Sequence, residues 1–540
     1  MKAVRGERLA PWVIGLTMAC PILVFRYPPM GDLAMHEALV AIMRHGTDAS
    51  WAPPGLYFVV APQANQLFHW LVYALSFVVP TDLACKLVVA MSVALAAPAM
   101  SALLHHLHLS RWPSLLVTPI LCGWIFRWGL AANMLSLPIL LVSMPLLERV
   151  ARRPSASRVA LSFGAACLIF FAHESSAFVF ALAAVYFGLT RATTIGSAVT
   201  RTSTALVVLA LAVAQWSVSH RLAGANMRAI GNDYGDDPLA RLSMLPSGIF
   251  GGLGTWRLAL IGGLSVVAHG ASAWGRHTAI LEGLPVRVLL WRYRYLVLSV
   301  TLFFFFFGFP MSLGGTTLLA HRFIAPACAF LIVACARPVT RPLAVAAATL
   351  VPLVMVALTI QTFRQVGREY RDLDEVLAQL PDDVSVAQLD LSPPTGGRAA
   401  PVPGAASRAL AVHGGRMLFA LTDMPPNPVF MPLAVQWNEP LLRLRFAPFA
   451  FMPTHDATRF AYLLVENHAA AFRALVRQAL APEERLVASA GVWDLYRSTL
   501  KVAPLDAPDE PLPTPAPETL ADRVGRLLAA SRESHEGGSH

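Results

Sequence analysis

Long apolar runs dominate the first two-thirds of the chain. About eleven of them are long enough to cross the roughly 30 Å hydrocarbon core of a bilayer, which takes about 20 apolar residues. They centre on Gly15, Ser92, Pro119, Leu140, Leu168, Ala181, Leu209, Gly263, Phe304, Ile332 and Val354. We therefore expect an all-α polytopic membrane protein with about eleven transmembrane helices in residues 1–361.

The segments that connect these runs differ in charge. One set is basic and holds Lys2, Arg5, Arg8, Arg111, Arg149, Arg152, Arg153, Arg158, Arg191, Arg201, Arg276, Arg287, Arg292, Arg294, Arg337 and Arg341. The other set is balanced or acidic and holds Asp32, Glu37, Asp48, Asp82, Glu174, Asp233, Asp236 and Asp237. Because basic connectors stay in the cytoplasm, we expect the N-terminus inside and the C-terminal part of the chain outside.

A further apolar run, Gly55–Pro80, is ambiguous. Polar side chains such as Gln63, Gln66 and His69 interrupt it and make a span costly. Counting it as a span would place the Arg149–Arg158 cluster outside, against the positive-inside rule. We expect residues 27–81 to form the first outer loop, with Gly55–Pro80 as a pair of juxtamembrane helices on the outer leaflet.

Composition changes after the last apolar run. Residues 362–500 alternate a polar helix at Arg364–Gln379 with short strand-like runs, which predicts a small extracytoplasmic α/β domain. The predicted strands are Val384–Leu391, Met417–Leu421, Tyr462–Val465 and Leu486–Ala490, the last continuing into Val492–Tyr496. Residues 501–540 are proline-rich and end in a short helix near Ala521–Ala530.

Bulk composition supports the membrane assignment and excludes other classes. The 540 residues are 56% hydrophobic and 14% charged, whereas soluble proteins are about a quarter charged. The net charge of +10 does not predict nucleic-acid binding, because no basic stripe is interleaved with aromatic residues. The six cysteines lie in apolar segments without a CxxC pair, so we expect neither a disulfide framework nor a metal site.

The first outer loop carries the leading candidate chemistry. Asp32 and His36 are four residues apart at the start of a predicted helix, so they share one face, and Glu37 follows. A carboxylate at an apolar boundary can act as general base on a hydroxyl, since its pKa rises toward the working range. The alternative is that Asp32 only caps the helix, a role that aspartate fills well.

Three other outer positions carry polar candidates for substrate binding. His173 and Glu174 form either a solvated hairpin turn or a second wall of the same cavity. Arg127, near Asn133, and Arg322, next to His321, either hold a phosphate or extend to the interface. No acidic cluster gives a clear metal-ligand set, so a divalent metal remains open.

This layout resembles the GT-C superfamily of integral membrane glycosyltransferases, which includes protein mannosyltransferases and aminoarabinose transferases. The resemblance covers most of the chain: an acidic residue just after span one, juxtamembrane helices, many spans and an outer C-terminal domain. It implies Asp32 as the catalytic carboxylate, Gly55–Pro80 as juxtamembrane helices and Arg322 as a contact to the donor phosphate. The first loop has Asp32 with His36 and Glu37 in place of the paired Asp-Glu or Asp-x-Asp found in many members.

The resemblance implies a glycosyltransferase in the bacterial inner membrane. It would move a hexose or pentose, with inversion, from a polyprenyl-phosphate-linked sugar donor in the membrane lipid to an extracytoplasmic glycan, lipid or protein acceptor. His36 would orient Asp32. Two alternatives stay open: a non-catalytic protein of cell-envelope polysaccharide assembly, and a lipid or glycan transporter.

Overall fold

The computed structural model describes most of the chain. The described residues are 2–60, 63–223, 237–251, 262, 285–311, 318–338, 341–391, 404–418, 427–431, 444, 447–507 and 516–536. The predicted span centred on Gly263, the acidic residues Asp233 and Asp236, and Arg276 lie outside them.

A bundle of long apolar helices forms the first part of the molecule. Five of the described helices are long and apolar enough to cross a membrane. They are α1 (Lys2–Val24), α4 (Thr81–His106), α7 (Ala131–Arg152), α10 (Ile195–Ala223) and α16 (Pro342–Glu369). A sixth span results if α13 (Val286–Arg292) and α14 (Arg294–Gly308), bent by 75° at their junction, count as one.

Shorter helices complete the bundle. They are α8 (Ala156–Ala172), α9 (Glu174–Arg191), α11 (Pro238–Phe250) and α15 (Ile324–Cys335). The apolar run centred on Pro119 is divided into η1 (Trp112–Leu116), α5 (Val117–Leu121) and α6 (Trp124–Trp128). Gly123 separates α5 from α6, and a side chain there would collide with the backbone of Ile249. The count of about eleven spans remains a prediction.

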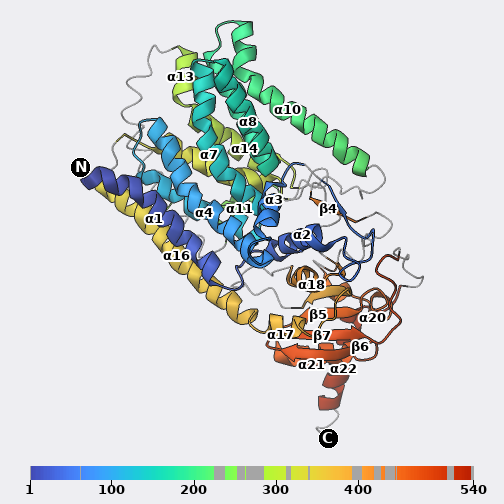
Figure 1. Cartoon of the computed structure of the whole chain (residues 1–540). Helices are drawn as coiled ribbons and strands as arrows, with labels where there is room; N and C mark the ends of the chain where they lie inside the picture. Colours follow the sequence, from blue (N-terminus) through green and yellow to red (C-terminus); the bar gives the residue numbers. More distant parts are fainter. Residues whose placement is uncertain are drawn as a thin grey trace.

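The two ends of the helix bundle differ in the chain segments that lie there. At one end, Ser110 links two other segments of the chain. Its N–H donates to the carbonyl of Arg337 (2.7 Å), and its hydroxyl donates to Glu7 on α1 (2.7 Å). Arg201 binds the carbonyl of Ala151 at this end (2.7 Å). We call it the basic end. The first outer loop and the C-terminal domain lie at the opposite end, which we call the site end (Figure 1).

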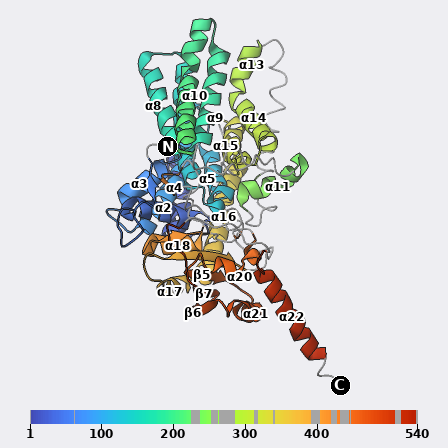
Figure 2. The ribbon, with the colours of Figure 1, turned by 90° about the vertical axis from the view of Figure 1, so that its right-hand side faces the viewer.

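The C-terminal domain is built on a five-stranded sheet with strand order β3-β2-β5-β7-β6. Its strands are β2 (Ser385–Asp390), β3 (Arg416–Met417), β5 (Tyr462–Glu466), β6 (Glu484–Ala490) and β7 (Trp493–Ser498). Strand β2 pairs in parallel with β3 and β5, while β7 is antiparallel to both neighbours. Helix α21 (Ala470–Leu480) connects β5 to β6, and α22 (Leu520–Glu536) extends away from the domain (Figure 2).

The first outer loop and the C-terminal domain form one packed unit. Helix α2 (Leu33–His45) packs on α18 (Ala405–His413), and β1 (Phe58–Val59) pairs antiparallel with β4 (Val429–Phe430). The region where the sequence predicted a helix pair holds one nine-residue helix, α3 (Leu67–Leu75), and β1 among its described residues. Helix α16 runs through the predicted boundary at 361/362 to Glu369 and leads into α17 (Leu373–Leu377).

Candidate functional site

The start of α2 is held against the turn between α6 and α7. The N–H of Gly31 donates to the carbonyl of Arg127 (2.8 Å). Gly129 has a φ of +79°, and a Cβ there would collide with the backbone nitrogen of Asp32. Asp32 occupies the N-cap position of α2, yet its side chain makes no capping hydrogen bond. A cap is therefore not what its carboxylate provides in this structure.

Two buried histidines, His36 and His69, lie close to the start of α2. His36 Nε2 lies 3.1 Å from the carbonyl of Gly129, and His36 Nδ1 lies 3.0 Å from His69 Nε2. Because a carbonyl only accepts, Nε2 of His36 carries its proton, and Nδ1 accepts from His69. Burial lowers the pKa of His36 and lowers that of His69 well below its ordinary value, so both rings are neutral at pH 7.

His173 forms the turn between α8 and α9 and contacts the predicted phosphate-binding arginine. Its Nε2 lies 2.8 Å from a guanidinium nitrogen of Arg322, which is on η3 (Ala320–Phe323). Its Nδ1 accepts the backbone N–H of Ser175 (3.1 Å) as the N-cap of α9. Nδ1 also lies 2.8 Å from the hydroxyl of Ser175, which receives the side-chain amide of Asn133 (3.3 Å). His173 thus contacts Arg322 directly, and Asn133 on α7 is linked to His173 through Ser175.

Arg322 joins these elements into one site. Its guanidinium lies within electrostatic reach of the carboxylates of Glu174 and Asp32. Glu174 is fixed by its backbone N–H, which donates to the side chain of Asn65 (2.8 Å). Residues from α2, the α8–α9 turn and η3 therefore converge at the site end, although they are far apart in the sequence.

Three of the sequence-predicted binding residues are engaged elsewhere. Arg127 donates to the carbonyl of Gly251. His321 stacks on Trp124, with ring centroids 4.6 Å apart. Glu37 binds Arg408 in the contact with the C-terminal domain. Sequence reasoning did not propose His69 as a site residue, because its place in a broken apolar run indicated only an interruption of the span.

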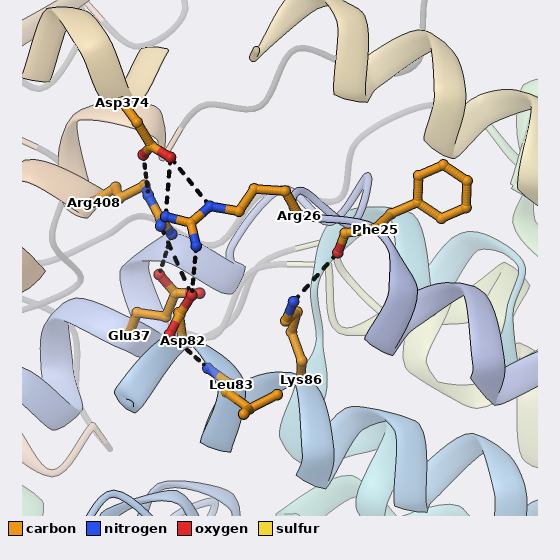
Figure 3. A network of polar contacts seen from close by, with 8 residues as sticks. All are labelled: Phe25, Arg26, Glu37, Asp82, Leu83, Lys86, Asp374 and Arg408. Atoms are coloured by element: carbon orange, nitrogen blue, oxygen red, sulfur yellow. Dashed lines mark hydrogen bonds and ion pairs between the residues drawn. The ribbon is translucent and has the colours of Figure 1, made fainter. Parts of the chain in front are cut away.

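Glu37 belongs to a charged network between the first loop and the C-terminal domain (Figure 3). Arg408 on α18 binds Glu37 (3.3 Å) and Asp374 (3.0 Å), and also lies 3.8 Å from Asp82. Arg26 reaches Asp374 (3.0 Å) and Asp82 (3.5 Å). Burial raises the pKa of Glu37 to about 7; Arg408 opposes this shift and Asp82 adds to it.

Within the described part of the chain, no group of three or more His, Cys, Asp or Glu residues is arranged to hold a metal ion. Asp32, His36 and Glu174 are thus not placed as a shared ligand set. The chemistry that the arrangement offers is a carboxylate near a half-buried arginine, with neutral imidazoles supporting both.

Fold and site together define a polytopic membrane protein with the fold of the GT-C membrane glycosyltransferases, as the sequence resemblance predicted. The chain is similar to the crystal structure of ArnT from Cupriavidus metallidurans in the apo state. The identity is 12%, the TM-score is 0.56, and the match covers 94% of this chain and 100% of that one.

Two further solved structures are similar. ArnT from the same organism bound to undecaprenyl phosphate matches with 11% identity and a TM-score of 0.53, over 93% of this chain and 98% of that one. The Archaeoglobus fulgidus oligosaccharyltransferase in the apo form matches with 10% identity and a TM-score of 0.42, over 92% and 75%. No protein-family model and no curated protein sequence matches the chain.

Proposed function

We propose that this protein is an inverting membrane glycosyltransferase that moves a sugar from a polyprenyl-phosphate donor to an acceptor outside the cytoplasm. The observation that carries the proposal is the convergence of Asp32 with Arg322 and His173 at the end of the bundle that also holds the C-terminal domain. The fold it shares with ArnT, one structure of which holds undecaprenyl phosphate, supports the choice of donor.

Arg322, Asp32 and His36 have separate roles in the proposed reaction. Arg322 pairs with the donor phosphate, and the N–H donors of its half-buried guanidinium stabilise the charge that develops there. Asp32 takes the proton of the acceptor hydroxyl as the hydroxyl oxygen bonds to the anomeric carbon. The bond between that carbon and the phosphate oxygen breaks, and the lipid phosphate leaves with the electron pair. His36, held by Gly129 and His69, positions the first turn of α2 that carries Asp32.

Orientation follows from the arginines. The basic end would face the cytoplasm of a bacterial inner membrane, since basic connectors are retained there. The site end would then open to the outer leaflet, where a lipid-linked donor can enter by lateral diffusion. The C-terminal domain, packed on α2 through α18, would border the acceptor, which is a glycan, a lipid or a protein.

Transfer by the purified protein from a panel of undecaprenyl-phosphate-linked hexoses and pentoses tests the proposal. Asp32→Asn removes the base, and we expect a fall in transfer of about 10²–10⁴-fold with unchanged yield. Arg322→Ala removes charged hydrogen bonds, and we expect binding of undecaprenyl phosphate to weaken about tenfold or more.

Asp48→Asn is the matched control. Asp48 lies in the same first loop, but its carboxylate is exposed and binds only Ser50 among the described residues, so transfer should not change. Full activity of Asp32→Asn would remove Asp32 from the mechanism. Absence of transfer by the wild-type protein with every donor would favour a non-catalytic assembly protein.

A further inference from the structure

The basic end contains a cluster of arginines around a single tryptophan. Trp291, at the end of α13, is buried and lies under three guanidinium groups. The guanidinium carbons of Arg191, Arg294 and Arg152 are 4.3, 4.7 and 5.5 Å from the centroid of its ring. Three positive charges, on α9, α14 and α7, thus each lie within 5.5 Å of the centre of one ring.

Only one carboxylate among the described residues, that of Glu148, forms ion pairs with the arginines of this cluster. Glu148 is fully buried and binds Arg294 (2.7 Å) and Arg152 (3.0 Å), and it accepts the hydroxyl of Tyr295 (2.9 Å). His106 lies 3.5 Å away. Arg294 binds Glu148 and the carbonyl of Trp291 (2.8 Å), so the one negative charge of Glu148 is shared between Arg294 and Arg152.

Arg191 is left with no carboxylate in contact. In the described part of the chain, its guanidinium rests on Trp291 without an ion pair, and the positive charges of Arg152, Arg294 and Arg201 each act on it more strongly than the negative charge of Glu148. Arg191 is exposed, and the side chain of Arg152 is 49% exposed. Like charges repel at this spacing, and the arrangement becomes favourable when an anion lies between them.

We propose that Arg191 and Arg152, above Trp291, bind the phosphate of an anionic phospholipid headgroup in the leaflet at the basic end. Two arginine forks suit the oxygens of one phosphate, and the tryptophan keeps both guanidinium groups oriented. Helix α13, which carries Trp291, and helix α2, which begins just after Asp32, lie at opposite ends of the bundle (Figure 1), so this site does not depend on the sugar-transfer proposal.

Apolar surface beside the cluster favours a lipid over a free phosphate. Leu189, two residues before Arg191, is 54% exposed, and Ile195, at the start of α10, is 86% exposed. The acyl chains of a lipid bound at the arginines would thus find exposed apolar residues close to Arg191 in the sequence. Basic pockets between helices at the cytoplasmic side are a common mode of recognising anionic lipid headgroups.

The test measures retained lipid and thermal stability of the purified full chain. Phosphatidylglycerol should raise the apparent melting temperature of the wild-type protein, while phosphatidylcholine and inorganic phosphate should not. Arg191→Gln should lower retention of phosphatidylglycerol about fivefold, and Arg152→Gln, Arg191→Gln together should lower it further. The side chain of Arg191 makes no hydrogen bond or ion pair within the described residues, so Arg191→Gln removes only its contact with Trp291.

Arg153→Gln is the control, because Arg153 is an exposed arginine at the same helix end that does not contact Trp291. Retention in this variant should match the wild-type value. An equal loss in Arg153→Gln and Arg191→Gln would mean general surface attraction and would overturn the site. Unchanged retention in Arg191→Gln would do so too, and equal stabilisation by inorganic phosphate would overturn the assignment to a lipid.

Discussion

The two ends of the bundle each bury a glutamate among arginines, but they differ in charge balance. At the site end, Glu37, Asp82 and Asp374 meet Arg26, Lys86 and Arg408, so carboxylates and cations are equal in number (Figure 3). At the basic end, Glu148 is the one carboxylate beside Arg152, Arg191, Arg201 and Arg294 in the described residues.

This difference separates two uses of buried charge. A balanced network satisfies itself and joins two parts of the protein, here the first loop and the C-terminal domain. A network with excess positive charge leaves donors for an external anion. Arg322 at the site end is intermediate between a balanced and an unbalanced network. Asp32 and Glu174 attract it electrostatically, while His173 forms a hydrogen bond with it.

Removing Glu148 should give the largest effect on stability. Glu148→Gln leaves Arg294 and Arg152 without their shared carboxylate inside the bundle, and breaking such a buried pair costs about 3–5 kcal/mol. We expect a clear fall in the apparent melting temperature in detergent. Glu375→Gln, an exposed acid on α17, is the control and should change the free energy of unfolding by less than about 0.5 kcal/mol. Equal stability of the two variants would contradict the central place given to Glu148.

Glu37 should behave differently from Glu148, because the contribution of Glu37 to the free energy of unfolding depends on pH. Its pKa is about 7 in the folded protein against an ordinary 4.5, so the folded state binds the proton more tightly than the unfolded state. The stability from this group is therefore complete below about pH 4.5 and is lost as pH rises to about 7. The shift corresponds to roughly 3 kcal/mol.

Glu37→Gln should remove this pH dependence. The neutral amide imitates the protonated acid and still offers an oxygen to Arg408, so we expect the variant to be at least as stable as wild type at pH 8. Melting curves of both proteins between pH 5 and pH 8 measure the difference. Parallel curves would show that Glu37 ionises in the folded state as it does in water.

The overall arrangement of helices and connectors could be predicted from the sequence because it depends on local patterns. Apolar runs indicate helices, and the charge of each connector needs no knowledge of its neighbours. Asp32 and Arg322 could be selected for the same reason, since each lies at the junction of a polar segment with an apolar one. Their approach to each other, through His173 and Glu174, is a property of the fold.

What could not be predicted are the pairings between distant segments. Arg408 follows Glu37 by 371 residues, and nothing in either neighbourhood indicates the other. Arg294 follows Glu148 by 146 residues in the same way. The division of the run around Pro119 also depends on packing, because Gly123 lies against the backbone of Ile249. Local pattern indicated a continuous span there.

Gly129→Ala should give the smallest change in stability but a selective change at the site end. A left-handed residue with a side chain costs about 1–2 kcal/mol, and the new Cβ would also displace the backbone of Asp32. Gly55→Ala is a matched control, because Gly55 has a similar φ of +84° with no atom within 4 Å of an added Cβ. Gly129→Ala should lose at least as much stability as Gly55→Ala, because its Cβ also meets the Asp32 backbone. Only Gly129→Ala should lose sugar transfer, because it shifts the carboxylate of Asp32 relative to Arg322. Equal transfer by the two variants would mean that the position of Asp32 against the α6–α7 turn does not matter for the reaction.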